Sequence, residues 1–160
     1  MGQYLYELTG DIRYNNENIQ NLDVLALRKH YFGYVPQDAS IINDTIRYNL
    51  FFTNTNVLDY ALFSKLTDLL NMNKWVNYDT LDTVIYENTL SGGEKQKLAI
   101  LKILYKNPVV MVFDEPTSAL EDKTSDAFIN YISSIKQDKI IIIITHDKKI
   151  KSHCDVIINI

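Results

Sequence analysis

A run of five apolar residues, Val109–Phe113, is followed directly by two acids, Asp114 and Glu115, and then by Pro116. Such an apolar run is typical of a strand that is buried in a parallel sheet. Open α/β sheets bind their ligands at the carboxyl ends of their strands, so the two acids are expected in a ligand site. One carboxylate can hold Mg²⁺ while the next orients or deprotonates a water molecule.

A segment with the sequence LSGGEKQ, Leu90–Gln96, lies upstream of these acids. Ser91, Gly92 and Gly93 have little or no side chain, so a ligand can approach their backbone closely. The spacing of the apolar residues that follow predicts a helix over 93–105 that is buried on more than one side. The start of a helix presents free N–H groups and a partial positive charge, which suit an anion such as phosphate. The segment therefore predicts a phosphate-binding site.

Other apolar runs predict the remaining elements of an α/β fold. Tyr31–Val35 is rich in β-forming residues and is followed by Pro36, which predicts a second strand. Ile140–Ile144 predicts another buried strand, and Val156–Ile160 predicts one more. Apolar residues at helical spacing predict helices over 45–51, 57–71 and 125–135.

The size and composition of the chain limit its class. It has 160 residues with a net charge of −4, and 46% of the residues are hydrophobic. A chain of this size is expected to form one globular domain that buries about 68–70% of its unfolded surface. The single cysteine, Cys154, excludes an internal disulfide and a multi-cysteine metal site. The longest apolar runs are far shorter than the ~20 residues of a membrane-spanning helix.

The segment LSGGEKQ, followed at this separation by VVMVFDEPTSAL (Val109–Leu120), resembles the nucleotide-binding domain of ATP-binding cassette (ABC) proteins. The resemblance implies an α/β fold of the P-loop NTPase type, in which a mostly parallel sheet is flanked by helices. It implies a helical subdomain with the glutamine loop and the signature over about residues 38–90. Residues 91–160 would then form the half of the core that contains the acid pair, the D-loop and the switch histidine. We therefore expect one partial ABC ATPase domain over residues 1–160.

Two further segments are similar to ABC exporters in particular. YVPQDASIINDTIRYNL, Tyr34–Leu50, looks like their strand, glutamine loop and following helix. Asp82–Asn88 stands where exporters have a short loop with a glutamate, and Glu87 matches that glutamate. The resemblance implies that Gln37 reaches Mg²⁺ and the attacking water while its loop contacts the membrane domain. From the residues alone, Gln37 is equally compatible with an exposed loop amide.

The resemblance also implies roles for the acids and for His146. Glu115 is expected to be the general base, and Asp114 to hold Mg²⁺ directly or through a water, with Gln37 beside it. His146 matches the histidine that contacts the γ-phosphate and keeps Glu115 and the water in line, although a lone histidine after a strand is more often structural. The expected nucleotide-binding residues of the signature are Ser91, Gly92, Gly93 and Glu94, which would act on an ATP held by a second subunit.

The sequence departs from the family pattern in two places. A P-loop, GxxxxGK[ST], holds phosphates with its backbone amides and its lysine, and the chain has no such motif. The segment that resembles the D-loop has Glu121 where the family usually has Asp. Met1–Gly2 matches the end of the helix after the P-loop, so we interpret the chain as a fragment. The isolated fragment is expected to bind ATP poorly and to be inactive.

The leading hypothesis is the ATP-hydrolysing domain or subunit of an ABC exporter, with ATP and Mg²⁺ as cofactors. Its expected partners are a transmembrane domain and a second nucleotide-binding domain in a head-to-tail dimer, at the cytoplasmic face of a membrane. One alternative is an ABC ATPase that acts on nucleic acid or ribosomes, which the exporter-like segments and an isoelectric point near 5.3 disfavour. Another is a non-catalytic module that lost the P-loop, and the presence of LSGGE, the acid pair and His146 together argues against it.

Overall fold

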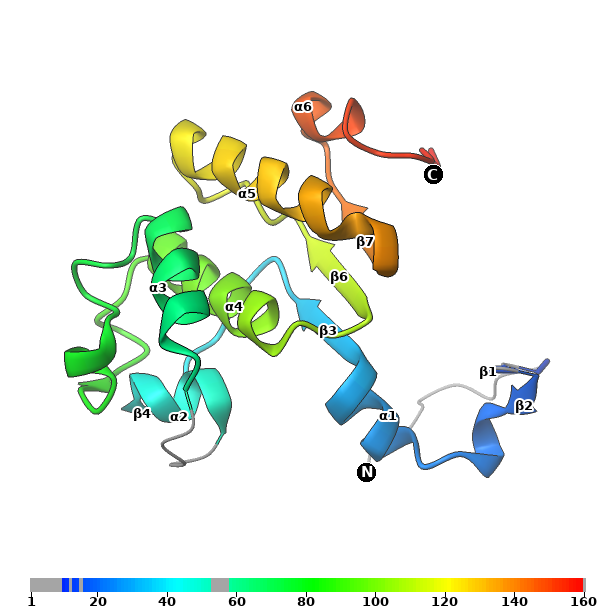
Figure 1. Cartoon of the computed structure of the whole chain (residues 1–160), viewed down its shortest axis with the longest axis horizontal. Coiled ribbons are helices and arrows are strands. Elements are labelled where there is room, and N and C mark those ends of the chain that lie inside the picture. The colour runs from blue at the N-terminus through cyan, green and yellow to red at the C-terminus, as the bar shows by residue number, and fades with distance from the viewer. Residues whose placement is uncertain (1–9, 12, 15, 53–57, 160) are drawn as a thin grey trace.

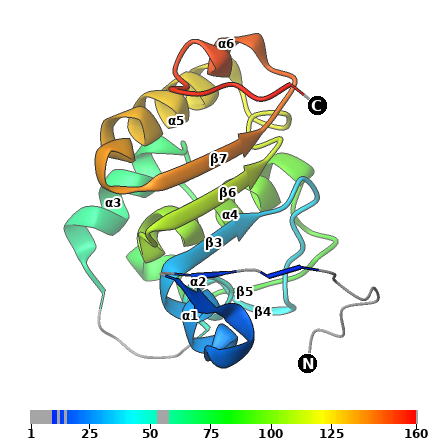
Figure 2. The ribbon, with the colours of Figure 1, turned by 90° about the vertical axis from the view of Figure 1, so that its right-hand side faces the viewer.

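The centre of the protein is a three-stranded sheet. The computed structural model describes residues 10–11, 13–14, 16–52 and 58–159, so the expected helix end at Met1–Gly2 lies outside the described residues. Strand β6 (Val110–Asp114) lies between β3 (Phe32–Val35) and β7 (Ile140–Ile144), and both pairings are parallel (Figure 2). The α/β class predicted from the sequence is confirmed.

Helices and short antiparallel ribbons surround this sheet (Figure 1). The helices are α1 (Val24–Tyr31), α2 (Ile46–Phe51), α3 (Tyr60–Leu69), α4 (Gly92–Lys106), α5 (Asp122–Ile135) and α6 (Lys148–Lys151), with 3-10 turns at Ile19–Asn21, Tyr78–Thr80 and Lys136–Asp138. The ribbons pair β1 (Arg13–Tyr14) with β2 (Glu17–Asn18), and β4 (Asp44–Thr45) with β5 (Val84–Ile85). Helices α2 and α3 lie in the 38–90 range expected for the helical subdomain, whose boundary stays a prediction.

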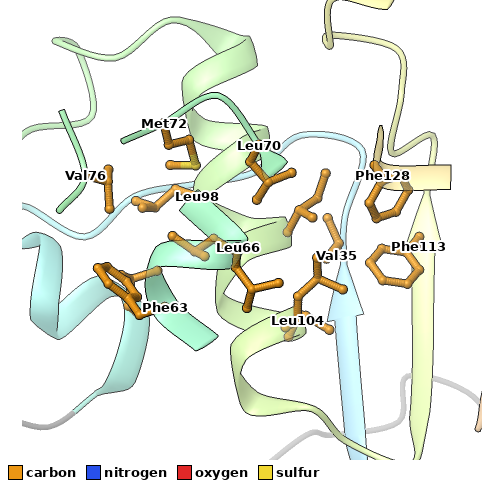
Figure 3. Packing of buried hydrophobic residues seen from close by; sticks show 14 of the residues in the cluster. Val35, Phe63, Leu66, Leu70, Met72, Val76, Leu98, Leu104, Phe113 and Phe128 are labelled. Atoms are coloured by element: carbon orange, nitrogen blue, oxygen red, sulfur yellow. The ribbon is translucent and has the colours of Figure 1, made fainter. Parts of the chain in front are cut away.

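One face of the sheet is covered by helices. Figure 2 shows α4 behind the strands and α5 at the upper left, next to β7. Met111 and Phe113 of β6 point to this side and are completely buried, and the Phe113 ring meets the edge of Phe128 from α5 at 5.3 Å between centroids. The apolar cluster continues from the sheet across α4 to α3, as the labelled side chains in Figure 3 show. Helix α4 is therefore buried on more than one side, as predicted.

The tight packing of α4 on the sheet depends on a glycine in β3. A Cβ added to Gly33 would lie 2.7 Å from Cγ2 of Ile103 and 2.9 Å from Cγ of Pro108. Asn107 ends α4 in the left-handed region at φ 53°, and its N–H donates to the Ile103 carbonyl at 3.0 Å. These contacts set the short connection from α4 into β6.

The prediction that Ile140–Ile144 is buried is wrong for every second residue. Ile140, Ile142 and Ile144 are 58%, 48% and 50% exposed, because they lie on the sheet face away from α4 and α5. Strand β7 is also at the edge of the three-stranded sheet. A continuous apolar run can therefore occupy an edge strand with one open face, which the run alone does not reveal.

The prediction of a strand over Val156–Ile160 is also wrong. Residues 156–159 form no strand, and Ile160 lies outside the described residues. Val156 and Ile158 are 76% and 80% exposed. A strand exists only where a neighbouring strand accepts and donates its backbone hydrogen bonds, and these residues have no such neighbour in the described part of the chain.

Candidate functional site

Four of the residues singled out from the sequence lie at or just after the ends of the three strands, at the same edge of the sheet: Gln37, Asp114, Glu115 and His146. The parallel register pairs Val35 with Phe113, and Asp114 with Ile144. The carboxyl ends of β3, β6 and β7 therefore lie side by side, which is where open α/β sheets bind ligands. Gln37 lies exposed in the loop after β3. Because the strands are in register, this loop, the acid pair and His146 emerge together.

Glu115 is held firmly at this edge. Its backbone N–H donates to the Ile144 carbonyl at 2.8 Å, and its φ of 45° places it in the left-handed region. The side chain is only 17% exposed. Its Oε2 accepts from the Thr145 hydroxyl at 3.2 Å, and its Oε1 accepts from the His146 N–H at 3.0 Å. Non-glycine residues rarely adopt this conformation, and those that do are often found at active sites. The strained turn therefore indicates a functional role for Glu115.

His146 places its ring beside the same carboxylate. Nε2 of the imidazole lies 3.8 Å from Oε1 of Glu115. The imidazole is fully exposed, with a relative side-chain exposure of 102%, so it is open to a ligand from the solvent side. Thr145 Oγ1 accepts from the Asp147 N–H at 3.0 Å, which fixes the turn after β7. The structure thus brings Glu115 and His146 together.

Asp114 lies one residue earlier and faces the other way. Its Oδ2 accepts from the Tyr34 hydroxyl at 3.3 Å, across the β3–β6 pair. Partial burial and the neighbouring Asp114 carboxylate raise the pKa of the Tyr34 phenol. Sequence reasoning missed Tyr34 as a neighbour of Asp114. The two residues are 80 positions apart, and only the register between β3 and β6 brings them into contact. The alternation within 31–35 could only have placed it on the open face.

The start of α4 is capped by its own residues. The Ser91 hydroxyl donates to Oε2 of Glu94 at 2.7 Å and accepts from the Glu94 N–H at 3.3 Å, while the Ser91 N–H donates to the same carboxylate oxygen at 2.8 Å. These hydrogen bonds from Ser91 lower the pKa of Glu94. The arrangement is a capping box, so both side chains have a structural role within the chain.

The two glycines of the signature have different surroundings. A Cβ added to Gly92 would have no heavy atom within 4 Å. A Cβ added to Gly93 would lie 2.6 Å from the carbonyl oxygen of Ala119. Gly93 therefore packs against the loop that begins at Glu115. Within this loop, the Ser118 N–H donates to the Glu115 carbonyl at 3.2 Å. Gly92 is the glycine whose surface is open.

Two cavities of about 250 Å³ each lie elsewhere in the described part of the chain. One is lined by Tyr34, the loop after Gln37 and α4 residues that include Lys102. The other lies between α5 and the chain around Lys149 and His153. Neither is lined by Asp114, Glu115 or His146. The candidate site is thus an open edge rather than an enclosed pocket, and within one chain Gly93 of the signature packs against the 115–119 loop of this site.

Known proteins resemble the chain along most of its length. The mitochondrial iron-sulfur clusters transporter ATM1 of Saccharomyces cerevisiae is 39% identical over 131 residues, which are 78% of this chain and 18% of that protein. The ATP-dependent lipid A-core flippase of Aliivibrio fischeri is 31% identical over 142 residues, which are 86% of this chain and 24% of that protein. The chain spans about a quarter of the length of the curated relatives it matches.

A solved structure and a sequence family agree with these relatives. The structure of a bacterial Atm1-family ABC exporter with ATP bound superposes with a TM-score of 0.73 and 29% identity, over 89% of this chain and 25% of that one. The family described as ABC transporter matches residues 2–118, a range that contains Gln37, the signature and the acid pair and ends before His146. Since this match covers well over half of the sequence, the chain belongs to the ABC transporter family.

Proposed function

We propose that the chain is part of the nucleotide-binding domain of an ABC exporter, in which ATP hydrolysis drives transport across a membrane. Membership of the family implies ATP binding. The observation that supports hydrolysis most strongly is the Glu115 carboxylate, which accepts hydrogen bonds from Thr145 and from the His146 N–H and lies beside the His146 ring. A carboxylate fixed in this way is suited to orient and deprotonate a water.

Glu115 acts as the general base in this proposal, and His146 contacts the γ-phosphate. Phosphoryl transfer to water depends on placement and on neutralising charge more than on covalent chemistry. The backbone N–H of His146 holds the carboxylate while its exposed imidazole extends toward solvent, so one residue both positions the base and faces the ligand. Gln37, in the exposed loop after β3, is proposed to reach Mg²⁺ and the attacking water.

The residues at this edge fit Mg²⁺. The described residues contain no group of three or more His, Cys, Asp or Glu that could hold a metal ion by themselves. Mg²⁺ bound with ATP needs only one or two protein carboxylates, because the phosphates and waters supply its other ligands. Asp114, with Gln37 nearby, would hold it, directly or through a water. When bound, Mg²⁺ would neutralise charge on the phosphates.

The signature acts on a nucleotide held by a second subunit, in a head-to-tail dimer. Gly92 has open space beside its Cα, and the first N–H groups of the 15-residue helix α4 lie at this turn. The proposed contacts to the γ-phosphate come from Ser91, Gly92 and Gly93. Glu94 contributes by capping the turn, because its carboxylate is bound to Ser91 rather than turned outward.

The membrane partner is proposed to dock beside the loop after Gln37. The cavity of about 250 Å³ at this place is lined by that loop, by α2 with Phe52 and by α4. In the described ranges, none of the helices is long and apolar enough to cross a membrane. With the membrane partner docked in this way, the chain is proposed to lie at the cytoplasmic face of a membrane.

ATP hydrolysis by the gene product that contains this sequence tests the proposal. We expect Mg²⁺-dependent turnover, and Glu115→Gln is expected to lower it by about 10²–10⁴-fold while ATP still binds. Glu17→Gln, on the exposed strand β2, is the matched control and should leave turnover unchanged. Equal turnover in Glu115→Gln and in the parent protein would remove Glu115 from this role.

A further inference from the structure

Glu87 joins two segments of the candidate site that are distant in sequence. Its Oε2 accepts from the Ile41 N–H at 2.6 Å, in the loop that follows Gln37. Its Oε1 accepts from the ammonium group of Lys95, in the first turns of α4. One carboxylate thereby connects the glutamine loop to the helix that begins with the signature.

The backbone around Glu87 strengthens this connection. The Glu87 N–H donates to Oδ1 of Asn43 at 2.9 Å. Asn49 of α2 exchanges two hydrogen bonds with the backbone of Ile42, each at 2.9 Å. The 41–43 loop is therefore tied both to α2 and to the segment before the signature, so it is a fixed platform rather than an independent loop.

On the helix side, the connection reaches the turn proposed to contact phosphate. The Lys95 N–H donates to the Ser91 carbonyl at 3.1 Å, and the Lys95 side chain is only 18% exposed. The next contact along the helix start is that of Gly93 with the Ala119 carbonyl in the loop from Glu115. The first turn of α4 thus has the Gln37 loop on one side and the Glu115 loop on the other.

The Glu87 contacts differ from those of an ordinary surface ion pair. Pairs of exposed charges contribute little to stability. Here the lysine is largely buried and the same carboxylate also accepts from a main-chain amide, so its loss leaves the Ile41 N–H without this acceptor. The Lys95 ammonium and the Ile41 N–H both favour the charged carboxylate and lower the pKa of Glu87.

We infer that Glu87 is a positioning residue that holds the Ser91–Gly93 turn in place relative to the loop after Gln37. The inference rests on the proposed function, since the turn and the loop matter together only if both act on ATP. In this role Glu87 acts within the domain, between the Ser91–Gly93 turn and the loop after Gln37. The relative placement of these two segments decides whether γ-phosphate, water and Mg²⁺ are aligned. Misplacement of such groups slows a reaction without removing any reacting group.

The first experiment measures amide hydrogen exchange on the 160-residue chain. Glu87→Ala should speed exchange of the Ile41 amide about tenfold, because its charged acceptor is gone. Glu87→Gln keeps an oxygen that can accept from Ile41 and should show a smaller increase. Asp155→Asn removes an exposed carboxylate from its pair with Lys136 and should leave Ile41 unchanged. Unchanged exchange of Ile41 in Glu87→Ala would overturn the inference.

The second experiment measures ATP turnover by the gene product that contains this sequence. Glu87→Ala should lower kcat about tenfold with KM for ATP nearly unchanged, and Glu87→Gln should recover part of the loss. Asp155→Asn should match the parent protein. Faster Ile41 exchange with an unchanged kcat would overturn the inference, since Glu87 would then be merely structural. If the parent protein has no turnover, the proposed function fails, while the exchange experiment still decides whether the connection exists.

Discussion

The different surroundings of the two signature glycines lead to a quantitative prediction for alanine substitution. In Gly93→Ala, the new Cβ would lie 2.6 Å from the Ala119 carbonyl oxygen, so the backbone of α4 or of the 115–119 loop has to shift. Overpacking of this kind destabilises by about 1–3 kcal/mol. Alanine is a better helix former than glycine by at most about 1 kcal/mol, which offsets part of the loss. With the full offset, the net expectation is a destabilisation of up to about 2 kcal/mol.

Gly92→Ala is the matched control, one residue away in the same helical turn. It meets no heavy atom within 4 Å, so only the helix preference remains. We expect it to be neutral or to stabilise by about 0.5 kcal/mol. Urea unfolding of the 160-residue chain, followed by far-ultraviolet circular dichroism, measures both changes. Equal free energies of unfolding for the two variants would refute the contact between Gly93 and Ala119.

Two further predictions concern Lys102 and β7. Burial and the nearby Lys106 lower the pKa of Lys102 to about 8 even though its Nζ lies 3.5 Å from the centre of the Phe52 ring, a contact that favours the charged form. As the pH rises, the folded protein therefore releases this proton before the unfolded chain does, so the free energy of unfolding should rise between about pH 8 and the ordinary lysine value of 10.5. This rise should be absent in Lys102→Met. If urea unfolding gave the same pH dependence for Lys102→Met and for the parent protein, the prediction would be contradicted. Strand β7 has an uncharged outer edge that is unpaired within the described ranges. The chain should therefore self-associate at high concentration, and Ile142→Lys should reduce this association. Light scattering that shows a monomeric parent chain would count against the prediction.

The sequence predicted the elements whose signals are local. The spacing of apolar residues predicts a helix over 93–105, and α4 spans Gly92–Lys106, where Ser91 and Glu94 form a capping box and Asn107 ends the helix. The runs at β3, β6 and β7 predict strands, of which Val109–Phe113 is the one expected to lie in a parallel sheet, and the acids and His146 follow their strands as expected. Local composition determines these features, so no knowledge of the fold was needed.

The features that sequence analysis missed depend on contacts between distant segments. An apolar run such as Ile140–Ile144 does not show which of its residues face a helix, so the exposure of Ile140, Ile142 and Ile144 follows only from the placement of α4 and α5 on one face of the sheet. The hydrogen bond from Tyr34 to Asp114 requires the register between β3 and β6. The bridge from Glu87 to Ile41 spans 46 positions and depends on how the loops fold back on each other. The sequence could match Glu87 to a family position but could not show what it contacts.

The central claim is that the carboxyl ends of β3, β6 and β7 form one ATP-hydrolysing edge. A crystal structure of the gene product that contains this sequence, with Mg²⁺ and a non-hydrolysable ATP analogue, tests it most directly. We predict that the γ-phosphate lies beside Glu115 and His146, with Mg²⁺ nearest to Asp114 and Gln37. A nucleotide bound away from this edge, with Glu115 still enclosed by Thr145 and His146 and contacting no phosphate-bound water, would contradict the account.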